Sequence, residues 1–256
     1  MRRNPWVRVG VLAICATAAF TAGGRSTEPV AAHGGDRAGE AAEFDLVKLF
    51  IEFNSTDEDV GLQLNLDGDA WRSLKGFNPR GELILDYVNR RSLSLQGVSS
   101  LFFESSEPTL KEVPLEEFFA RFPEGEYKFK GVTVDLERIE GVGSLTHKIP
   151  AGPEIVSPPQ AEEPPEVDVD DLVITWKPVE EDIFGSDDIE IVGYQVTVAQ
   201  LEPFRELSFH LPATVTSIPI PAEFFEQLGE EHEFEVLAIE IGGNQTITAG
   251  AFVPER

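Results

Sequence analysis

The sequence predicts an all-β protein: two β-sandwich (immunoglobulin-like) domains in tandem, with one short helix in the first. Apolar and polar residues alternate with a period of two over short segments of residues 44–256, as in strands with one buried face. Gly, Pro, Asn and Asp separate these segments at short intervals, which is typical of all-β domains. With 41% hydrophobic residues the chain can form packed cores, so a fully disordered chain is excluded.

Residues 1–25 have the pattern of a secretory signal peptide. Three arginines precede an apolar run from residue 9 to residue 20, and small residues follow. This run is too short to span a bilayer, which needs about 20 residues. We therefore expect an exported protein with no membrane span after signal cleavage. Whether cleavage follows Ala18 or falls near Gly23, and whether the signal is retained as an anchor, stays open.

Charge and cysteine content restrict the partners and the chemistry. The chain has 46 acidic and 20 basic residues and a net charge of −26, so it has too few cations to bind nucleic acid phosphates. Signal removal makes the net charge about −30, because four arginines and no acid leave with it. The single cysteine, Cys15, lies in the signal, which excludes an intrachain disulfide and a cysteine-based zinc site.

Two connecting segments separate the domains. Residues 26–43 are small, polar and rich in glycine, which predicts a flexible linker with His33 in solvent rather than bound to a metal. Residues 151–168 are rich in proline, which predicts a semi-rigid extended connector. These boundaries leave an N-terminal mainly-β domain at residues 44–150 and a second domain at residues 169–256.

The first half of the N-terminal domain is predicted to consist of strands and turns. Alternation predicts strands at residues 44–53 and 60–66, and Asp67-Gly68-Asp69 predicts a tight turn that ends the second strand. Residues 71–77 and 82–88 predict a hairpin around Asn78-Pro79-Arg80-Gly81, whose Pro and Gly positions fit a type I turn.

The second half of this domain contains the predicted helix. Leu101-Phe102-Phe103 is apolar, and we expect it to be buried. Residues 114–122 predict a short helix, with Pro at its start, acids in its first turn and Leu115 and three phenylalanines on one face. Alternation at residues 126–133 and 141–149 predicts two further strands.

Short strands recur through the second domain, a spacing that indicates an immunoglobulin-like sandwich. The predicted strands lie at residues 172–176, 191–198, 205–211, 217–221 and 232–239, and a turn at 242–245 follows.

Residues 153–252 resemble a fibronectin type III domain. The resemblance rests on Pro153 and Pro158, Trp176 in Ile-Thr-Trp, Tyr194 in Gly-Tyr-Gln-Val, the segment 232–239 and the Gly-Gly-Asn turn after it. It implies that Trp176 and Tyr194 are core residues. At the corner where that family has a leucine and a tyrosine, this chain has Phe225 or Leu228 and then His232. The mature chain also resembles exported bacterial proteins that carry such a domain, which implies no particular activity.

No local motif for catalysis or cofactor binding occurs, and we predict no catalytic, cofactor-binding or metal-ligating residues. The widely spaced His147, His210 and His232 are interpreted as structural or exposed, because a site needs convergent partners. Adjacent Glu116 and Glu117, like Glu230 and Glu231, point in different directions on a helix or strand, so we interpret them as solvated surface.

Calcium is the one ligand that the acidic segments suggest, because hard cations need several oxygens close together. The candidates are Asp57-Glu58-Asp59, Asp67 with Asp69, and Asp168 with Asp170 and Asp171. None completes an EF-hand loop. The last group lies at the predicted domain junction, where an ion would stiffen the hinge. Whether it binds calcium stays open.

Modular build and missing catalytic motifs favour a non-enzymatic binding or adaptor protein, periplasmic or secreted, in the bacterial cell envelope. Its β-sandwich loops would bind an unknown protein or glycan. A structural spacer of the envelope is the first alternative, and it expects no exposed apolar patch or groove. A hydrolase with its site in the N-terminal domain is the second. That alternative expects a deep pocket lined by a His or carboxyl of shifted pKa.

Overall fold

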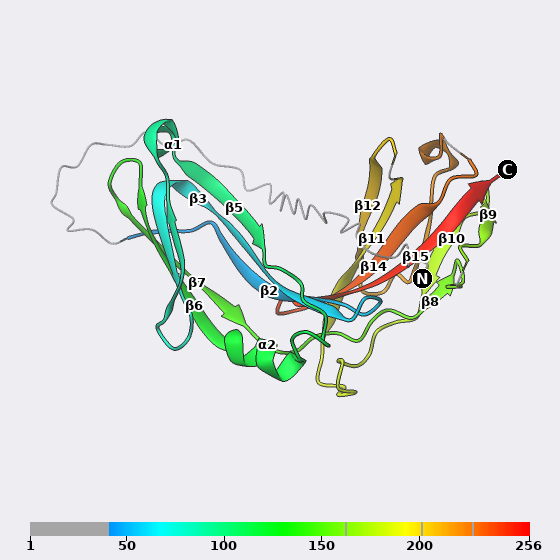
Figure 1. The fold of residues 1–256 in the computed structure, drawn as a ribbon, viewed down its shortest axis with the longest axis horizontal. Helices are drawn as coiled ribbons and strands as arrows, with labels where there is room; N and C mark the ends of the chain where they lie inside the picture. The colour runs from blue at the N-terminus through cyan, green and yellow to red at the C-terminus, as the bar shows by residue number, and fades with distance from the viewer. Residues whose placement is uncertain (1–40, 162, 201, 227) are drawn as a thin grey trace. The chain divides into compact units, whose positions relative to one another are not determined.

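The computed structural model describes residues 41–256 apart from residues 162, 201 and 227 (Figure 1). The predicted signal peptide at residues 1–25 and most of the predicted linker, including His33, lie outside the described residues. Within them, strands dominate and the two α-helices are short, so the all-β prediction is confirmed.

The elements of the first part are β1 (Ala42–Glu43), β2 (Leu46–Asn54), β3 (Asp59–Phe77), β4 (Leu83–Val88), α1 (Arg91–Gln96), β5 (Val98–Glu104), α2 (Leu115–Arg121), β6 (Gly125–Thr133) and β7 (Arg138–Leu145). The second part contains β8 (Ile155–Ser157), β9 (Glu166–Asp168), β10 (Val173–Trp176), β11 (Ile191–Gln200), β12 (Arg205–Pro212), β13 (Ser217–Pro219), a short 3-10 helix (Ala222–Phe224), β14 (His232–Glu240) and β15 (Gln245–Glu255).

Strand β3 is one 19-residue strand that changes partners along its length. Its first part pairs with β2 and β5, and its second part pairs with β4 and β6. The tight turn predicted at Asp67-Gly68-Asp69 is therefore wrong. A Cβ on Gly68 would lie 3.2 Å from side-chain atoms of both Ile139 and Phe44. The glycine thus permits close packing inside a continuous strand, and it does not reverse the chain.

Enlarging residue 68 should destabilise the protein in steps. We expect Gly68→Ala to cost about 1 kcal/mol of unfolding free energy and Gly68→Val about 1–3 kcal/mol, because an overpacked core must displace Phe44 and Ile139. Urea unfolding at constant m-value measures both. If Gly68→Val is as stable as the natural chain, residue 68 lies in a turn or in open space, and the continuous strand is contradicted.

The predicted hairpin of β3 and β4 is confirmed. Asn78 stabilises its turn, because its Oδ1 accepts hydrogen bonds from the backbone N–H groups of Arg80 and Glu82. Gly81 has φ +80°, a left-handed conformation that glycine adopts without strain.

The segment between β4 and β6 differs in two respects from the prediction. Helix α1 was not predicted, and none of its residues is buried. Phe102 was expected to be buried but is exposed, because the side chains of β5, which pairs with β3, alternate between core and solvent. Helix α2 is confirmed, and its Phe118 is buried.

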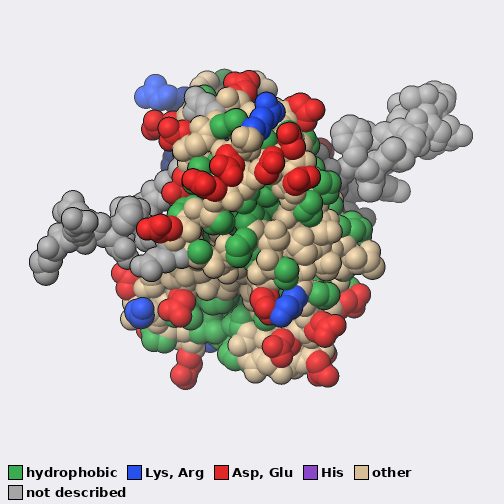
Figure 2. Space-filling model, turned by 90° about the vertical axis from the view of Figure 1, so that its right-hand side faces the viewer, with side chains coloured by type: hydrophobic (Ala, Val, Ile, Leu, Met, Phe, Trp, Pro, Cys, Tyr) green, Lys and Arg blue, Asp and Glu red, His purple; other side chains and the backbone are tan. Residues whose placement is uncertain are grey.

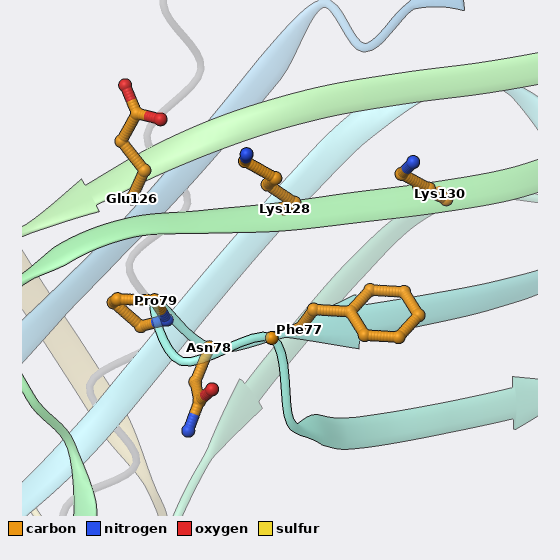
Figure 3. Close-up of a pocket in the computed structure, with 7 residues that line it drawn as sticks. Phe77, Asn78, Pro79, Glu126, Lys128 and Lys130 are labelled. Atoms are coloured by element: carbon orange, nitrogen blue, oxygen red, sulfur yellow. The ribbon is translucent and has the colours of Figure 1, made fainter.

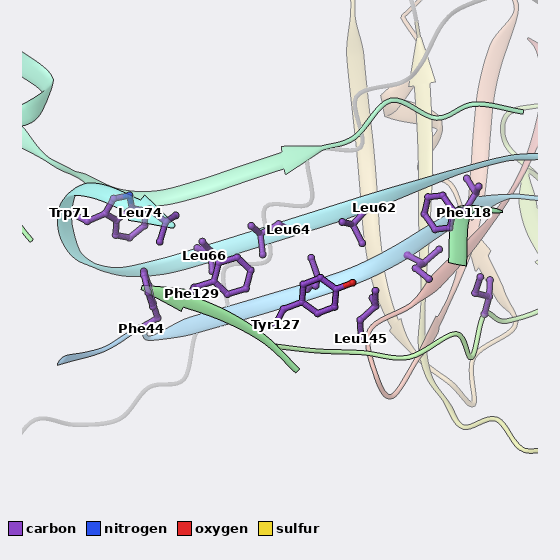
Figure 4. Packing of buried hydrophobic residues seen from close by; sticks show 14 of the residues in the cluster. Phe44, Leu62, Leu64, Leu66, Trp71, Leu74, Phe118, Tyr127, Phe129 and Leu145 are labelled. Atoms are coloured by element: carbon purple, nitrogen blue, oxygen red, sulfur yellow. The ribbon is translucent and has the colours of Figure 1, made fainter. Parts of the chain in front are cut away.

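Buried residues form two separate clusters. The N-terminal core (Figure 4) gathers side chains from β2, β3, β6, β7 and α2, and it includes Trp71, Phe118 and Phe129. The C-terminal core gathers side chains from β10, β11, β14 and β15. Most members of each cluster come from the buried faces of the strands.

The core residues that the fibronectin type III resemblance implied are confirmed. Trp176 and Tyr194 are buried, and their rings meet edge to face with centroids 5.3 Å apart. At the corner, Phe225 is the buried member and Leu228 is exposed. The His232 ring lies 5.2 Å from the Phe225 ring, and its Nδ1 is hydrogen-bonded to the carbonyl oxygen of Glu230 at 3.0 Å.

Hydrogen bonds connect the two parts of the described chain. The first residues of β15 pair in parallel with the end of β2, so one sheet continues from β3 through β2 and β15 to β14. The proline-rich segment adds two short strands, since β8 pairs with β10 and β9 pairs with β15. The domain boundaries at residues 44–150, 151–168 and 169–256 stay predictions.

Candidate functional site

Lysines gather on the outer face of the sheet formed by β4, β3, β6 and β7. Directly opposite residues on antiparallel strands point to the same side of a sheet. Lys75 on β3 lies opposite Lys130 on β6, and Phe77 lies opposite Lys128. Tyr127 and Phe129, which alternate with these lysines on β6, belong to the N-terminal core. We refer to Lys75, Phe77, Lys128 and Lys130 as the lysine face.

Exposed aliphatic side chains flank the lysine face. Leu83 on β4 lies opposite Phe77 and is 50% exposed. Val142 on β7 lies opposite Lys128 and is 52% exposed. One row of side chains across four strands therefore places an aromatic ring and a cation between two apolar groups.

An open pocket of about 440 Å³ lies at the end of this face (Figure 3). It is lined by Phe77, Asn78, Pro79, Gly81, Glu126, Lys128 and Lys130. Lys75 lies 4.0 Å from Asp86, whereas Lys128 and Lys130 form no ion pair with any described residue. Their ammonium groups are available to an anionic partner.

Three lysines lie close together on the lysine face, and Lys75 and Lys130 lie opposite Asp86 and Glu140 on the neighbouring strands. The face drawn in Figure 2 carries many more Asp and Glu than Lys and Arg side chains. The whole chain has 46 acidic and only 20 basic residues. Lys128 and Lys130, which form no ion pair with a described residue, therefore stand beside apolar groups on β6.

A second candidate site consists of carboxyl groups. Glu52 on β2, Glu104 at the end of β5 and Glu107 after it each place an oxygen within 4.8 Å of the other two. Glu52 is 3% exposed, whereas Glu104 and Glu107 are open to solvent. We refer to these three residues as the carboxylate cluster.

Strand pairing explains how the cluster forms. Glu52 lies opposite Gly61 on β3 and Gln245 on β15, and the Gln245 amide donates a hydrogen bond to Glu52 Oε2. The Glu107 side chain packs over Gly61, where an added Cβ would lie 2.8 Å from Glu107 Cγ. Gln63 Nε2 donates a hydrogen bond to Glu104 Oε1 at 3.3 Å.

Burial and crowding of like charge raise the pKa values of Glu52 and Glu107. Loss of hydration is the main cause, and it raises the pKa of Glu52 to about 7 and that of Glu107 to about 8. Neighbouring carboxyls add to both shifts, while hydrogen bonds from glutamine amides oppose the shift at Glu52. On β14, burial raises the pKa of Glu235 to about 8, and the Glu52 carboxyl contributes.

The structure does not gather the acidic residues that the sequence suggested for calcium. Asp168 Oδ1 accepts a hydrogen bond from the Asp170 backbone N–H at 2.9 Å, and Asp170 lies 3.9 Å from Arg256. Among the described residues, the carboxylate cluster is the group of three that brings its oxygens together. Glu52 comes from β2, and Glu104 and Glu107 come from one stretch at the end of β5, so no single local motif marks the cluster. The pair Lys128-x-Lys130 on a strand was visible in the sequence but was not singled out.

The histidines do not converge on a shared site. His147 Nε2 is hydrogen-bonded to the Phe122 carbonyl oxygen at 2.8 Å, and its ring stacks on Phe119. His210 is exposed on β12, and His232 is buried in the C-terminal core. Glu117 forms an ion pair with Arg121 on α2.

Three solved structures are similar to this chain. A two-domain fibronectin type III segment from chicken tenascin is 10% identical, with a TM-score of 0.27, over 82% of this chain and 98% of the other. A tetra-tandem repeat from the extending region of a large adhesion protein is 8% identical, with a TM-score of 0.27, over 82% of this chain and 50% of the other. The FN1–FN3 domains of chicken CNTN1 are 11% identical, with a TM-score of 0.26, over 83% of this chain and 67% of the other. At these values the likenesses carry no inference about binding or activity.

No protein-family model matches the sequence, and no curated protein matches it. In the part of the chain that the structure describes, no helix combines the length and the apolar character needed to cross a membrane.

Proposed function

We propose that the chain is an exported, non-enzymatic binding protein of the bacterial cell envelope, and that it binds a partner protein through the lysine face. The observation that carries the proposal is the row Leu83, Phe77, Lys128 and Val142, which combines exposed apolar groups with a cation. Exposed apolar side chains that gather on one face are typical of protein interaction sites. Lys128 and Lys130 add preference for a partner with carboxylates.

The same row bears on the two alternatives. A spacer without a specific ligand expects no exposed apolar patch, and this face exposes Leu83 and Val142. A hydrolase expects carboxyls of raised pKa to line a pocket. Glu52, Glu107 and Glu235 line neither the pocket at the lysine face nor the pocket between residues 151–154 and 177–187. Both points favour a binding protein.

Reversal of two charges on the lysine face should abolish partner binding. The immobilised full chain and its variant Lys128→Glu/Lys130→Glu are incubated with envelope extract of the host, and bound proteins are quantified by mass spectrometry. We expect one protein to be retained by the natural chain and reduced at least about tenfold by the variant, because attraction becomes repulsion. Retention should also weaken as salt is raised.

The matched control is Lys111→Glu/Lys177→Glu, which makes the same charge change at two exposed lysines outside the lysine face. It should retain the partner like the natural chain. If both variants retain equally little of the partner, the loss comes from the change in net charge and not from the lysine face. If the Lys128→Glu/Lys130→Glu variant still retains the partner, the binding surface lies elsewhere. A chain that retains nothing would favour the spacer.

A further inference from the structure

The carboxylate cluster has the geometry of a cation site. Two oxygens bound to one Ca²⁺ ion at about 2.3–2.6 Å lie at most about 5.2 Å apart. The oxygens of Glu52, Glu104 and Glu107 lie within 4.8 Å of one another. A point at most about 2.8 Å from all three therefore exists, and side-chain movements of a few tenths of an ångström bring them to Ca²⁺ bonding distance. The shorter bonds of Mg²⁺, about 2.0–2.1 Å, set a limit of about 4.2 Å and a stricter geometry. The spacing therefore fits Ca²⁺ better than Mg²⁺.

Gln63 provides an independent sign of a missing ligand. Its side chain is 1% exposed, and its Oε1 has no hydrogen-bond partner among the described residues. The amide lies inside the cluster, because its Nε2 donates to Glu104 and it also hydrogen-bonds the Glu52 carboxyl. A buried amide oxygen without a partner is destabilising, because it has lost its hydrogen bonds to water. A cation at the cluster would satisfy that oxygen.

We propose that Glu52, Glu104, Glu107 and the amide oxygen of Gln63 bind one Ca²⁺ ion. These four oxygens supply part of the six to eight ligands that the ion takes, and water supplies the others because Glu104 and Glu107 are open to solvent. The ligands come from β2, β3, β5 and the segment after β5, and Glu52 is also hydrogen-bonded to Gln245 on β15. The ion would stiffen the junction of β2 and β15.

Charge supports the same conclusion. The neighbours that act on Glu52 and Glu107 are other carboxyls and two glutamine amides. These carboxyls repel one another unless a cation lies between them.

Calorimetric titration and thermal unfolding of the full chain with CaCl₂ at pH 8, after treatment with EDTA, test the proposal. At a hundredfold excess of Ca²⁺ over its Kd, we expect Tm to rise by roughly 5–10 °C. MgCl₂ should raise it less. The variant Glu104→Gln/Glu107→Gln changes two exposed ligands. Its Kd for Ca²⁺ should be at least about tenfold higher than that of the natural chain. In EDTA it should melt above the natural chain, because the repulsion is gone.

Two controls separate this site from others. Glu230→Gln/Glu231→Gln makes the same charge change at two exposed residues and should keep the Ca²⁺ response. Asp168→Asn/Asp170→Asn should keep it as well. The proposal is overturned if the natural chain shows neither heat nor a Tm rise, if the response persists in Glu104→Gln/Glu107→Gln, or if Asp168→Asn/Asp170→Asn abolishes it.

Discussion

Replacing Asn244 by alanine should destabilise the protein by about 3–5 kcal/mol, the largest loss that we expect from a single polar side chain. Asn244 lies between β14 and β15 and is 1% exposed. Its Oδ1 accepts a hydrogen bond from the Ile51 N–H at 2.8 Å, and its Nδ2 donates to the carbonyl oxygens of Thr146 and Lys148, each at 2.9 Å. Alanine leaves these backbone groups without a partner in a site that excludes water.

The matched control is Asn89→Ala, which removes another buried asparagine. Asn89 makes one hydrogen bond, from its Nδ2 to the Trp71 carbonyl oxygen, and its Oδ1 has no partner among the described residues. Its loss should cost about 1 kcal/mol. Urea unfolding of both variants gives the comparison. Equal costs would show that Asn244 does not connect the two parts through its three backbone partners.

The alternation of apolar and polar residues predicted most strands, because this pattern depends only on residues that are neighbours in the chain. Phe44 to Phe53 and His232 to Ile239 were found in this way, and Trp176 and Tyr194 were placed in a core by the family resemblance. The errors arose where tertiary contacts decide. Asp67-Gly68-Asp69 has the composition of a turn, but the close approach of Phe44 and Ile139 to Gly68 keeps it in a strand.

The candidate sites were less accessible to sequence analysis, because they depend on register. Glu52 meets Glu104 and Glu107 only because β2 and β5 both pair with β3, and Gln245 joins them only through the parallel pairing of β15 with β2. The pairings of β5 with β3 and of β15 with β2 connect residues far apart in the chain, and the sequence contains 46 acidic residues from which to choose. The sequence suggested acidic runs such as Asp168 to Asp171 as calcium ligands, but the structure does not bring their oxygens together.

Glu52→Gln should make the protein more stable at pH 8 by about 3 kcal/mol and leave it unchanged near pH 4.5, with EDTA present throughout. Burial raises the pKa of Glu52 from 4.5 to about 7, so the native state holds this proton more tightly than the unfolded chain. The stability that the proton contributes is complete below about pH 4.5 and is lost as pH rises through about 7. Glutamine never ionises, and its amide oxygen can still accept the hydrogen bond from Gln245.

Urea unfolding from pH 4.5 to pH 8.5 measures the difference between Glu52→Gln and the natural chain. Glu126→Gln, an exposed residue of β6, is the control and should change stability by less than about 0.5 kcal/mol at every pH. A difference that is the same at both ends of the range would trace the effect to packing rather than to buried charge. A loss of stability at pH 8 would mean that Glu52 is paired with a cation there even in EDTA. The buried carboxylate would then be a stabilising group, and the repulsion inferred for the carboxylate cluster would be wrong.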